Sequence, residues 1–560
     1  MSAETEFDVC VVGSGTGGAP VALALAEAGY SVVVLEKGPR FTEADFAKDE
    51  LACCRRDVFS PALTDEPHVT AAQGGTPTST ARSGQSWWNG NCVGGATNFM
   101  SGYFHRLKPM DFRLRSEFGP VEGADIRDWP IGYDDLEPYY ARVEEAVGVS
   151  GRVTDHPAAE PRSTADFPYP PTLEHPVADW IDRTAAERGL HPFPVPRAIL
   201  PTATGGRDGC SYSGYCGAYG CPTGAKGSAR AALLDRAEAT GRCVVRPLSQ
   251  VHRLVSDRRG RVTAAEYSRY ADTGDHPRRV TARAFAVACQ PVETARLLLA
   301  SPGPAHPHGL ANGSGLVGRY LLFSAGGAGE GRLAYADLDT EDQMALRVEG
   351  PFVNRAVQDF YALTDPELGG RAKGGTVDFM LAHNNPLARA HGAKRDEAGD
   401  LVWGRALKQR LKEQFRTGRR VRFEVFCDWS PLPESRVTLD PEVTDRWGKP
   451  VARVRHASHA RDRAVGQRLA RESARVLEAL GARDIDWSVS AYPPTNLVAG
   501  GCRFGTDPDT AVLDPDCRAF GADNLYITDA SFMPTGGSVP FTWTIYANAF
   551  RVADRLRAAL

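Results

Sequence analysis

Residues 7–38 read FDVCVVGSGTGGAPVALALAEAGYSVVVLEKG, and this stretch decides the fold of the chain. Its first part, FDVCVVGSG, predicts a buried strand, and residues 15–29 then carry apolar side chains at helical spacing and predict a helix. Gly29 ends that helix, and residues 31–38 predict a second strand. A strand, a helix and a strand in this order form a β-α-β unit, so we expect the sheet that they start to be parallel.

The turn between the first strand and the helix carries the pattern G-x-G-x-x-G at Gly13, Gly15 and Gly18. The first glycine permits a tight turn, the second lets the backbone approach a pyrophosphate, and the third allows close packing of helix and strand. The N-terminus of the helix, with Thr16 in the same turn, then faces the phosphates. Glu36 ends the second strand about twenty residues on, where a carboxylate accepts hydrogen bonds from an adenosine ribose. The stretch therefore predicts a dinucleotide site.

The size and composition of the chain bound the remaining possibilities. A chain of 560 residues is too long for one hydrophobic core, because cores stop growing near roughly 250–300 residues. The net charge of −4 is small for this length and indicates no nucleic-acid or membrane partner. No apolar run approaches the roughly 20 residues that a membrane helix needs. Residues 1–15 show no targeting pattern, so we expect a cytoplasmic protein.

Later segments predict further elements. Residues 131–151 and 460–481 have the pattern of amphipathic helices, and 407–422 predicts a solvated basic helix. Residues 243–300 are strand-rich and predict a meander, followed by a helix that starts at Pro291.

Three of the 12 cysteines, Cys210, Cys216 and Cys221, lie close together in the sequence. A cysteine before a proline is typical of some iron–sulfur ligands, but gaps of six and five residues match no common ferredoxin spacing. We therefore expect a packing role for these cysteines and no metal site.

Several longer segments resemble, in the same order, the glucose-methanol-choline family of FAD-dependent oxidoreductases. They are SWWNGNCVGGATNFMSGYFHRLKPMDFR (86–113), GCPTGAKGSAR (220–230), SRVTLDPEVTDRWGKPV (435–451), CRFGTDPDTAVLDPDCRAFGADNLYITDASFMPTGGS (502–538) and TIYANAFRVAD (544–554). The stretches VGGAT and DWPIGYDDLEPYY are most similar to its bacterial gluconate-dehydrogenase-like and sugar-oxidising branch.

The resemblance implies an α/β fold with a Rossmann-like FAD-binding domain on a parallel sheet and a substrate domain with a mostly antiparallel sheet. The FAD domain is expected to be discontinuous, with segments 1–110, 205–320 and 495–560, and the substrate domain is expected to take 111–204 and 321–494.

The family motifs also imply which residues bind FAD. The adenosine half is expected at the glycine turn and Glu36, with Val251 facing the adenine through its backbone, and Asp529 at the ribityl or pyrophosphate part. The flavin ring is expected against Asn91, Val93, Gly94, Asn98, Phe99, Met100, Pro540, Phe541 and Thr542. Some members tether FAD through a histidine, but Phe99 stands at that place, which predicts noncovalent FAD.

Two positions that carry the chemistry in this family are replaced. Alcohol oxidation needs a base for the hydroxyl proton while a hydride leaves the carbon for flavin N5. The usual base position holds Leu497, and the second usual position holds Pro540, or Val539 if the prolines are matched instead. Gln290 and Pro291 also stand where the family favours glycine and alanine.

Three interpretations of this site remain open. In the first, the protein oxidises an alcohol with a displaced base, and Asn496, Thr542 and His383 are the candidate catalytic residues. In the second, the flavin serves amine oxidation, desaturation, or a redox-neutral lyase or isomerase reaction. In the third, catalysis is lost and the flavin is structural.

We expect the first interpretation, with a polar small molecule of the sugar, cyclitol, aminosugar or nucleoside type as substrate. Trp87, Trp88 and Trp429 are candidates for stacking on a sugar ring. The sequence leaves the electron acceptor open among oxygen, a quinone and a carrier protein.

Overall fold

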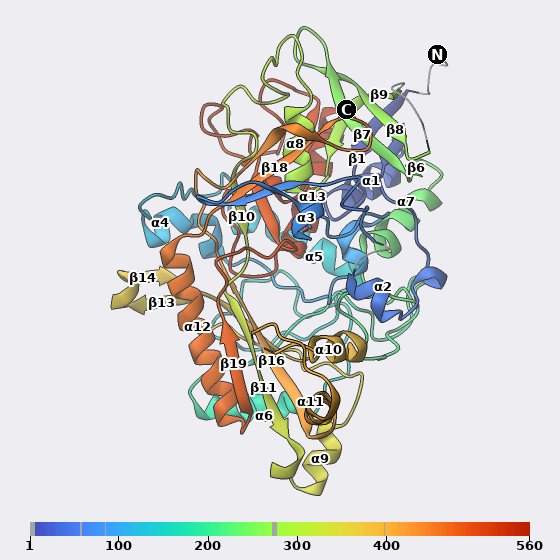
Figure 1. The fold of residues 1–560 in the computed structure, drawn as a ribbon. Helices are drawn as coiled ribbons and strands as arrows, with labels where there is room; N and C mark the ends of the chain where they lie inside the picture. The colour runs from blue at the N-terminus through green and yellow to red at the C-terminus, as the bar shows by residue number, and fades with distance from the viewer. Residues whose placement is uncertain (1–5, 56–58, 85, 272–276, 383, 397) are drawn as a thin grey trace.

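The computed structural model describes residues 6–55, 59–84, 86–271, 277–382, 384–396 and 398–560. Figure 1 shows two halves, one around a largely parallel sheet near the C-terminus of the chain and one around the antiparallel strands β11, β16 and β19. Both parts of the predicted fold class are therefore confirmed.

The parallel sheet begins with the stretch that decides the fold. β1 (Phe7–Val12) pairs in parallel with β2 (Val32–Leu35), and α1 (Gly18–Glu27) connects them. β2 pairs in parallel with β6 (Cys243–Arg246) on its other edge. Every residue of β2 is buried, as expected for a strand that is covered on both faces.

β9 (Arg278–Val287) joins this sheet to an antiparallel ribbon. Its first residues pair with β8 (Val262–Arg269), which pairs in turn with β7 (Ser249–Ser256). Its last residues pair in parallel with β1 and with β21 (Leu525–Ile527). The predicted meander is thus present as β7, β8 and β9, while the segment before it is a separate strand of the parallel sheet.

One long helix, at the C-terminus of the chain, packs beside α1. α13 (Thr542–Ala559) lies against α1 and against α5 (Tyr133–Val143). The helix predicted after the meander is α8 (Pro291–Leu299). It contacts β7 of the first sheet and strands of the second sheet. α8 therefore fixes the two sheets relative to each other.

The second sheet has the strand order β20, β10, β17, β18, β3, β4. Its strands come from distant parts of the chain, namely β20 (Val498–Gly501), β10 (Arg319–Phe323), β17 (Arg436–Thr444), β18 (Pro450–His456), β3 (Val69–Ala72) and β4 (Thr78–Ser79). The β18–β3 pair is parallel and the other pairs are antiparallel.

The third sheet is antiparallel throughout its described pairs. Its order is β19 (Arg483–Ser488), β11 (Gly327–Ala334), β16 (Gly418–Cys427), β15 (Gly375–Leu381), β12 (Arg355–Val357) and β5 (Phe193–Pro194). The predicted helix α12 (Ala460–Ala479) covers one face, where Leu469 and Leu477 share a core with Phe423 and Val425. Figure 1 shows α12 lying along β19 and β11.

The basic segment 407–422 was predicted as one helix, and that boundary is wrong. The helix α11 (Gly404–Arg416) ends before Gly418, and the following residues form β16. Residues 418–427 alternate between buried and less buried positions, which is the period of a strand with one covered face.

The shorter elements complete the chain. The hairpin β13 (Ala362–Asp365) and β14 (Gly370–Lys373) stands apart from the three sheets. The remaining α-helices are α2 (Glu50–Arg55), α3 (Thr80–Ser83), α4 (Leu114–Phe118), α6 (Val177–Glu187), α7 (Asp235–Ala239), α9 (Thr340–Leu346) and α10 (Pro386–Gly392).

Candidate active site

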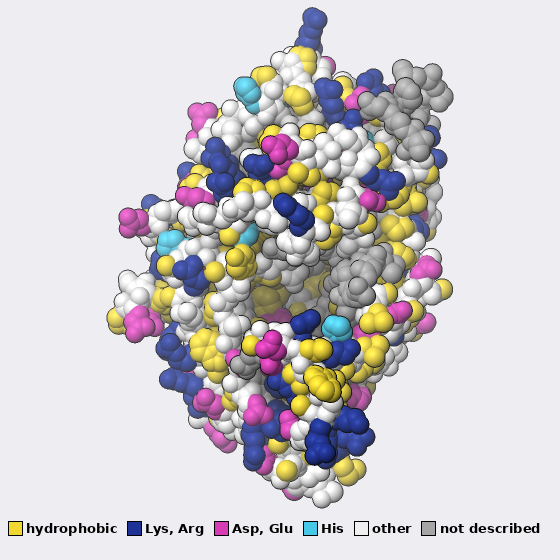
Figure 2. All heavy atoms as spheres, in the orientation of Figure 1, with side chains coloured by type: hydrophobic (Ala, Val, Ile, Leu, Met, Phe, Trp, Pro, Cys, Tyr) yellow, Lys and Arg dark blue, Asp and Glu magenta, His cyan; other side chains and the backbone are white. Residues whose placement is uncertain are grey.

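A cavity of about 500 Å³ runs from the glycine turn after β1 to the strand β16 of the third sheet. Figure 2 shows a recess near the middle of the face in view, between the two halves of the molecule. Of the predicted site residues, those that line the cavity are Gly13, Gly15, Thr16, Glu36, Asn91, Phe99, Met100, Val251, Asn496, Leu497, Asp529, Pro540, Phe541 and Thr542. The structure therefore brings together segments that lie hundreds of residues apart.

The glycine turn shows three different reasons for a glycine. Gly13 has a φ of +96°, and a Cβ there would lie 2.3 Å from the Ala288 carbonyl oxygen. A Cβ on Gly18 would lie 2.0 Å from the Gly13 carbonyl oxygen. A Cβ on Gly15 would meet no protein atom within 4 Å, although Gly15 lines the cavity. The protein fold thus requires the first and third glycines, and the open space at Gly15 suits a ligand.

Glu36 is buried where β2 ends. Its carboxylate accepts hydrogen bonds from the Ser14 backbone nitrogen at 3.0 Å, from the Ser14 hydroxyl at 2.5 Å and from the Gly38 backbone nitrogen at 2.8 Å. Burial raises the pKa of Glu36, and the bonds from Gly38 and Ser14 oppose that rise. These bonds hold the carboxylate at the cavity wall beside the glycine turn.

Asp529 follows β21 at the same edge of the parallel sheet. Its carboxylate accepts hydrogen bonds from the Thr294 hydroxyl at 2.5 Å and from the Ser531 backbone nitrogen at 2.8 Å. Burial raises the pKa of Asp529, against the effect of these bonds. Its carboxylate is therefore fixed in one orientation on the cavity wall.

Gln290 and Arg296 line the cavity near the start of α8. The Gln290 Oε1 atom accepts a hydrogen bond from the Val292 backbone nitrogen and so caps α8, while Gln290 itself has a φ of +76°. The Gln290 Nε2 and Arg296 Nη1 atoms are buried and have no acceptor within the described residues. A dinucleotide with a pyrophosphate needs buried hydrogen-bond donors, a glycine with open space beside it and a helix N-terminus. The cavity supplies all three, so its residues fit FAD.

Four predicted cofactor residues, Gly18, Val93, Gly94 and Asn98, do not line the cavity. The Asn98 side chain donates to the Val93 carbonyl oxygen at 2.9 Å and to that of Gly95 at 3.0 Å. Gly94 has a φ of +90°, and a Cβ there would lie 2.8 Å from the Arg230 Cβ. Val93, Gly94 and Asn98 thus shape the loop whose neighbours Asn91, Phe99 and Met100 reach the cavity, while Gly18 packs against Gly13 in the glycine turn.

Of the residues at the replaced positions, Leu497 and Pro540 line the cavity. Asn496 and Leu497 precede β20, and Pro540 and Thr542 stand at the start of α13. Val539 is buried and does not line the cavity. His383 lies outside the described residues. Leu497 and Pro540 thus bring apolar surface to a wall that Asn496 and Thr542 share.

Models of the GMC oxidoreductase family match residues 196–323 and 431–549, and a model of an FAD binding domain matches residues 8–48. A 2-methyl-1,2-propanediol dehydrogenase from Mycolicibacterium austroafricanum is 30% identical to the chain over 559 residues, which is 98% of this chain and 95% of the relative. The chain belongs to the GMC oxidoreductase family.

Two further comparisons agree with this family. A paromamine 6'-oxidase from Streptomyces fradiae is 30% identical over 559 residues, covering 99% of this chain and 92% of that protein. The solved structure of a formate oxidase from Aspergillus oryzae has a TM-score of 0.65 at 15% identity, covering 100% of this chain and 99% of that chain, and it shows the shared fold. This GMC oxidoreductase is an FAD-dependent enzyme that oxidises CH–OH groups, as the sequence predicted.

The structure adds cavity residues that the sequence analysis missed. Ser101 and Tyr103 follow the flavin loop, and Glu424 and Phe426 come from β16. The period-two burial of β16 would have placed Glu424 and Phe426 on one face, but the segment before it was assigned to a helix. Of the three tryptophans considered for stacking on a sugar ring, Trp87 and Trp88 line the cavity. The Trp429 indole lies away from it and donates to the Ala457 carbonyl oxygen.

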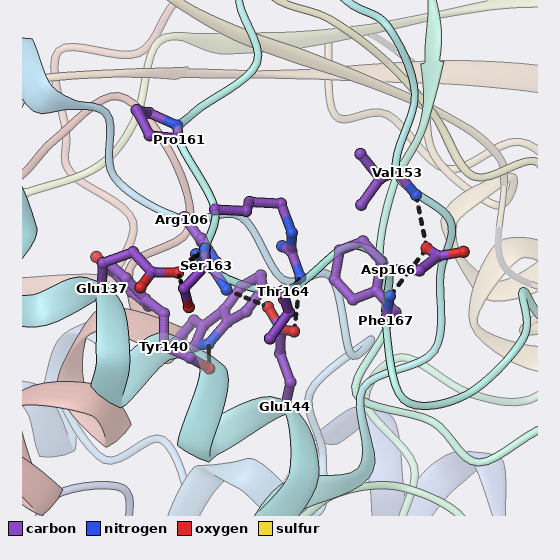
Figure 3. Close-up of polar contacts among 12 residues, drawn as sticks. Arg106, Glu137, Tyr140, Glu144, Val153, Pro161, Ser163, Thr164, Asp166 and Phe167 are labelled. Carbon is purple, nitrogen blue, oxygen red and sulfur yellow. Dashed lines mark hydrogen bonds and ion pairs between the residues drawn. The ribbon is translucent and has the colours of Figure 1, made fainter.

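A buried ion-pair cluster supports the start of α13 (Figure 3). The Arg106 guanidinium donates to Glu137 at 2.9 Å and to Glu144 at 2.5 Å. Arg162 donates to the other Glu144 oxygen at 2.7 Å. The Trp543 indole in the first turn of α13 donates to the Tyr140 carbonyl oxygen. Because Thr542 precedes Trp543, these contacts hold the helix end that reaches the cavity.

The three clustered cysteines stay unpaired thiols in the structure. Within the described ranges, no group of three or more His, Cys, Asp or Glu side chains is arranged to hold a metal ion. Cys210, Cys216 and Cys221 pack against Ile199 and Leu200. In the part of the chain that the structure covers, no helix combines the length and apolar character needed to cross a membrane.

Proposed function

We propose that this GMC oxidoreductase binds FAD noncovalently in the cavity and oxidises a CH–OH group of a small polar molecule of the sugar, cyclitol, aminosugar or nucleoside type. The observation that carries the proposal is the cavity itself, which joins the glycine turn at one end to polar side chains from β16 and the 496–497 segment at the other. A diol dehydrogenase and an aminosugar oxidase among the relatives support a polar alcohol as substrate.

The residues of the parallel sheet supply the adenosine and phosphate half of the proposed FAD site. Gly13, Gly15 and Thr16 would surround the pyrophosphate at the N-terminus of α1, and Glu36 would accept from the ribose hydroxyls. The Val251 backbone would face the adenine, and Asp529 would accept from the ribityl chain. The predicted domain division, with FAD segments 1–110, 205–320 and 495–560, is part of the same proposal.

The other end would hold the flavin ring and the substrate. Asn91, Phe99, Met100, Pro540, Phe541 and Thr542 would line the ring, while Val93, Gly94 and Asn98 would support it from behind. Gly18 would support the ADP half, in the glycine turn. When bound, FAD supplies the two-electron acceptor for the hydride that leaves the substrate carbon. The protein contributes by orienting the alcohol, excluding water and accepting the hydroxyl proton.

Phe99 supports noncovalent binding because its side chain is a hydrocarbon with no atom that forms a tether. Its ring packs on Phe59 with centroids 4.1 Å apart and is buried in an aromatic cluster. Precipitating the holoenzyme with acid should therefore release all the FAD into the supernatant. Flavin that stays with the pellet would contradict this part of the proposal.

Anaerobic bleaching of the bound flavin tests the reaction. The purified holoenzyme is mixed without oxygen with 2-methyl-1,2-propanediol, paromamine, and a panel of polyols and nucleosides. Loss of the oxidised flavin spectrum together with formation of a carbonyl product is the expected result. A substrate that is converted without flavin reduction, or a panel that yields no reduction and no product, would refute the proposal.

The electron acceptor is tested with the first substrate that reduces the flavin. Relatives of this chain include both an oxidase and a dehydrogenase. Comparing the rate of oxygen consumption with the rate of reduction of an added quinone identifies the acceptor under the same conditions.

A further inference from the structure

Strand β16 has two faces with different environments. Val421, Phe423, Val425 and Cys427 are buried in the core beneath α12. Glu424 and Phe426 point to the opposite face and line the cavity. Since side chains alternate along a strand, the packing of Phe423 and Val425 fixes the direction of Glu424 toward the cavity.

The Glu424 carboxylate has few partners. Among the described residues, its ion-pair contact is with Arg422 on the same strand, whose Nη2 atom lies 3.8 Å from the Glu424 Oε1 atom. Asp378 on β15 is the direct cross-strand neighbour of Glu424. Like charges directly opposite each other on adjacent strands repel. Burial, offset by Arg422 and reinforced by Asp378, raises the pKa of Glu424.

The exposure of Glu424 agrees with this environment. Its side chain keeps 38% of its surface accessible, and it lies in the cavity wall. The carboxylate therefore faces the cavity, which has room for a ligand. A substrate in the cavity would reach the carboxylate directly.

Most of the other titratable groups of the cavity lie at its dinucleotide end. The residues that stand at the ends of β2 and β21 or at α8 belong to the dinucleotide end, namely Glu36, Lys37, Cys289, Glu293, Arg296 and Asp529. Among the described residues that line the cavity, this leaves Tyr103 and Glu424. Burial raises the pKa of Tyr103 to about 12. The Asp378 and Glu424 carboxylates add to this rise, and Arg197 opposes it. Tyr103 therefore keeps its proton.

The geometry points to Glu424 as the catalytic base that takes the substrate hydroxyl proton in place of the residue replaced by Leu497. In this step the substrate O–H bond breaks and its proton passes to a Glu424 carboxylate oxygen. The C–H bond would break at the same time and the C–O bond would become C=O, with bound FAD supplying the acceptor for the hydride and its two electrons. Glu424 then returns the proton to water. This inference rests on the proposed function.

Asp378 and His105 act as positioning residues for this base. Asp378 is fully buried, and its Oδ1 atom lies 3.1 Å from the His105 Nε2 atom. This contact holds Asp378 opposite Glu424, where its carboxylate raises the pKa of Glu424 and so makes Glu424 a stronger proton acceptor.

The first test is rapid-mixing reduction of the holoenzyme without oxygen. The Glu424→Gln variant keeps the size of the side chain and removes the proton acceptor. With whichever of 2-methyl-1,2-propanediol and paromamine reduces the wild type, the limiting rate of flavin reduction should fall by about 10²- to 10⁴-fold. The half-saturating probe concentration should change little. The increase of the wild-type rate with pH should be absent in the variant.

Glu442→Gln is the matched control, because Glu442 is an exposed residue of β17 outside the cavity. It should leave rate and pH dependence unchanged. Glu424→Asp, which retains a carboxylate on a shorter side chain, should recover part of the rate that Glu424→Gln loses.

The second test uses the apoprotein and needs no turnover. A raised pKa means that folded Glu424 binds more protons than unfolded Glu424 above about pH 4.5, the ordinary value of a glutamate. The stability of the wild type relative to Glu424→Gln should therefore fall as the pH rises above 4.5. The difference in urea midpoint between the two proteins measures this change.

The outcomes separate this inference from the proposed function. If the flavin of the Glu424→Gln variant is reduced as fast as that of the wild type, the proposed function stands and the role of Glu424 is overturned. A variant that raises only the half-saturating concentration makes Glu424 a binding group and also overturns it, as does a stability difference that is independent of pH. A wild type that no probe reduces refutes the proposed function and this inference together.

Discussion

Gly15 offers the sharpest test of the cofactor site, because the structure gives the protein itself no reason for a glycine there. A Cβ at this position would meet no protein atom within 4 Å, and the backbone is outside the left-handed region. The substitution Gly15→Ala therefore fills only cavity space. We expect it to leave the fold intact and to weaken FAD binding.

The magnitudes of the two effects follow from separate causes. Replacing glycine by alanine at an unstrained position reduces the entropy of the unfolded chain and stabilises the apoprotein by about 0.4–1 kcal/mol. The added methyl group keeps a phosphate away from the backbone N–H groups of the turn. Loss of one hydrogen bond to a charged group costs about 1.5–3 kcal/mol, which corresponds to an increase of about 10- to 150-fold in the Kd for FAD.

Two measurements on the same protein preparation test this. Urea unfolding of the apoprotein gives the stability, and titration with FAD followed by flavin fluorescence gives the Kd. Gly18→Ala is the control, because its Cβ would lie 2.0 Å from the Gly13 carbonyl oxygen and 3.0 Å from the Val11 Cγ1 atom. It should destabilise the apoprotein by about 1–3 kcal/mol. A Gly15→Ala protein that binds FAD like the wild type would refute this account of the turn.

Three further predictions concern buried groups around the site. Glu144→Gln should destabilise the protein by about 3–5 kcal/mol in urea unfolding, because it removes the carboxylate that Arg106 and Arg162 share and leaves Glu137 as the remaining carboxylate beside Arg106, whereas the exposed Glu27→Gln should change stability by less than about 0.5 kcal/mol. Burial raises the pKa of Glu293, but Arg296, His68 and Lys37 hold it below its usual range. The stability advantage of the wild type over Glu293→Gln should thus be present above about pH 4.5 and shrink as the pH falls below it. At Gln290 the φ of +76° favours glycine, so Gln290→Gly should be more stable than Gln290→Ala by about 1–3 kcal/mol; equal thermal midpoints would contradict strain there.

The glycine turn shows how far local pattern predicts this molecule. Residues 7–38 contain both strands, the connecting helix and the ligand-facing turn within one short segment, so spacing alone places them correctly. The helices α8 and α12 were predicted for the same reason, since each has a continuous apolar stripe. The position of Val251 on the cavity wall followed from family motifs and not from local pattern.

The third sheet shows where sequence reasoning loses information. Strands β11, β15 and β16 are adjacent in space but are separated in sequence by long connections, and no local pattern records their pairing. Arg419, Arg420 and Arg422 after Gly418 continue the charge pattern of α11, so the start of β16 was taken for the end of the helix. Without that strand, Glu424 has no defined face and could not be placed in the cavity.

If Glu424 is the base, as inferred above, the same architecture explains how the base can stand away from Leu497. The wall that carries Leu497 and the wall that carries Glu424 come from different sheets, and both face the cavity. On β16, Phe423 and Val425 pack in the core beneath α12, while the residues on the cavity side of the strand do not belong to that core. A carboxylate can therefore be added on that side without altering the FAD site or the core. The chemistry of the reaction requires a proton acceptor beside the substrate, and it does not require that the acceptor come from one particular wall.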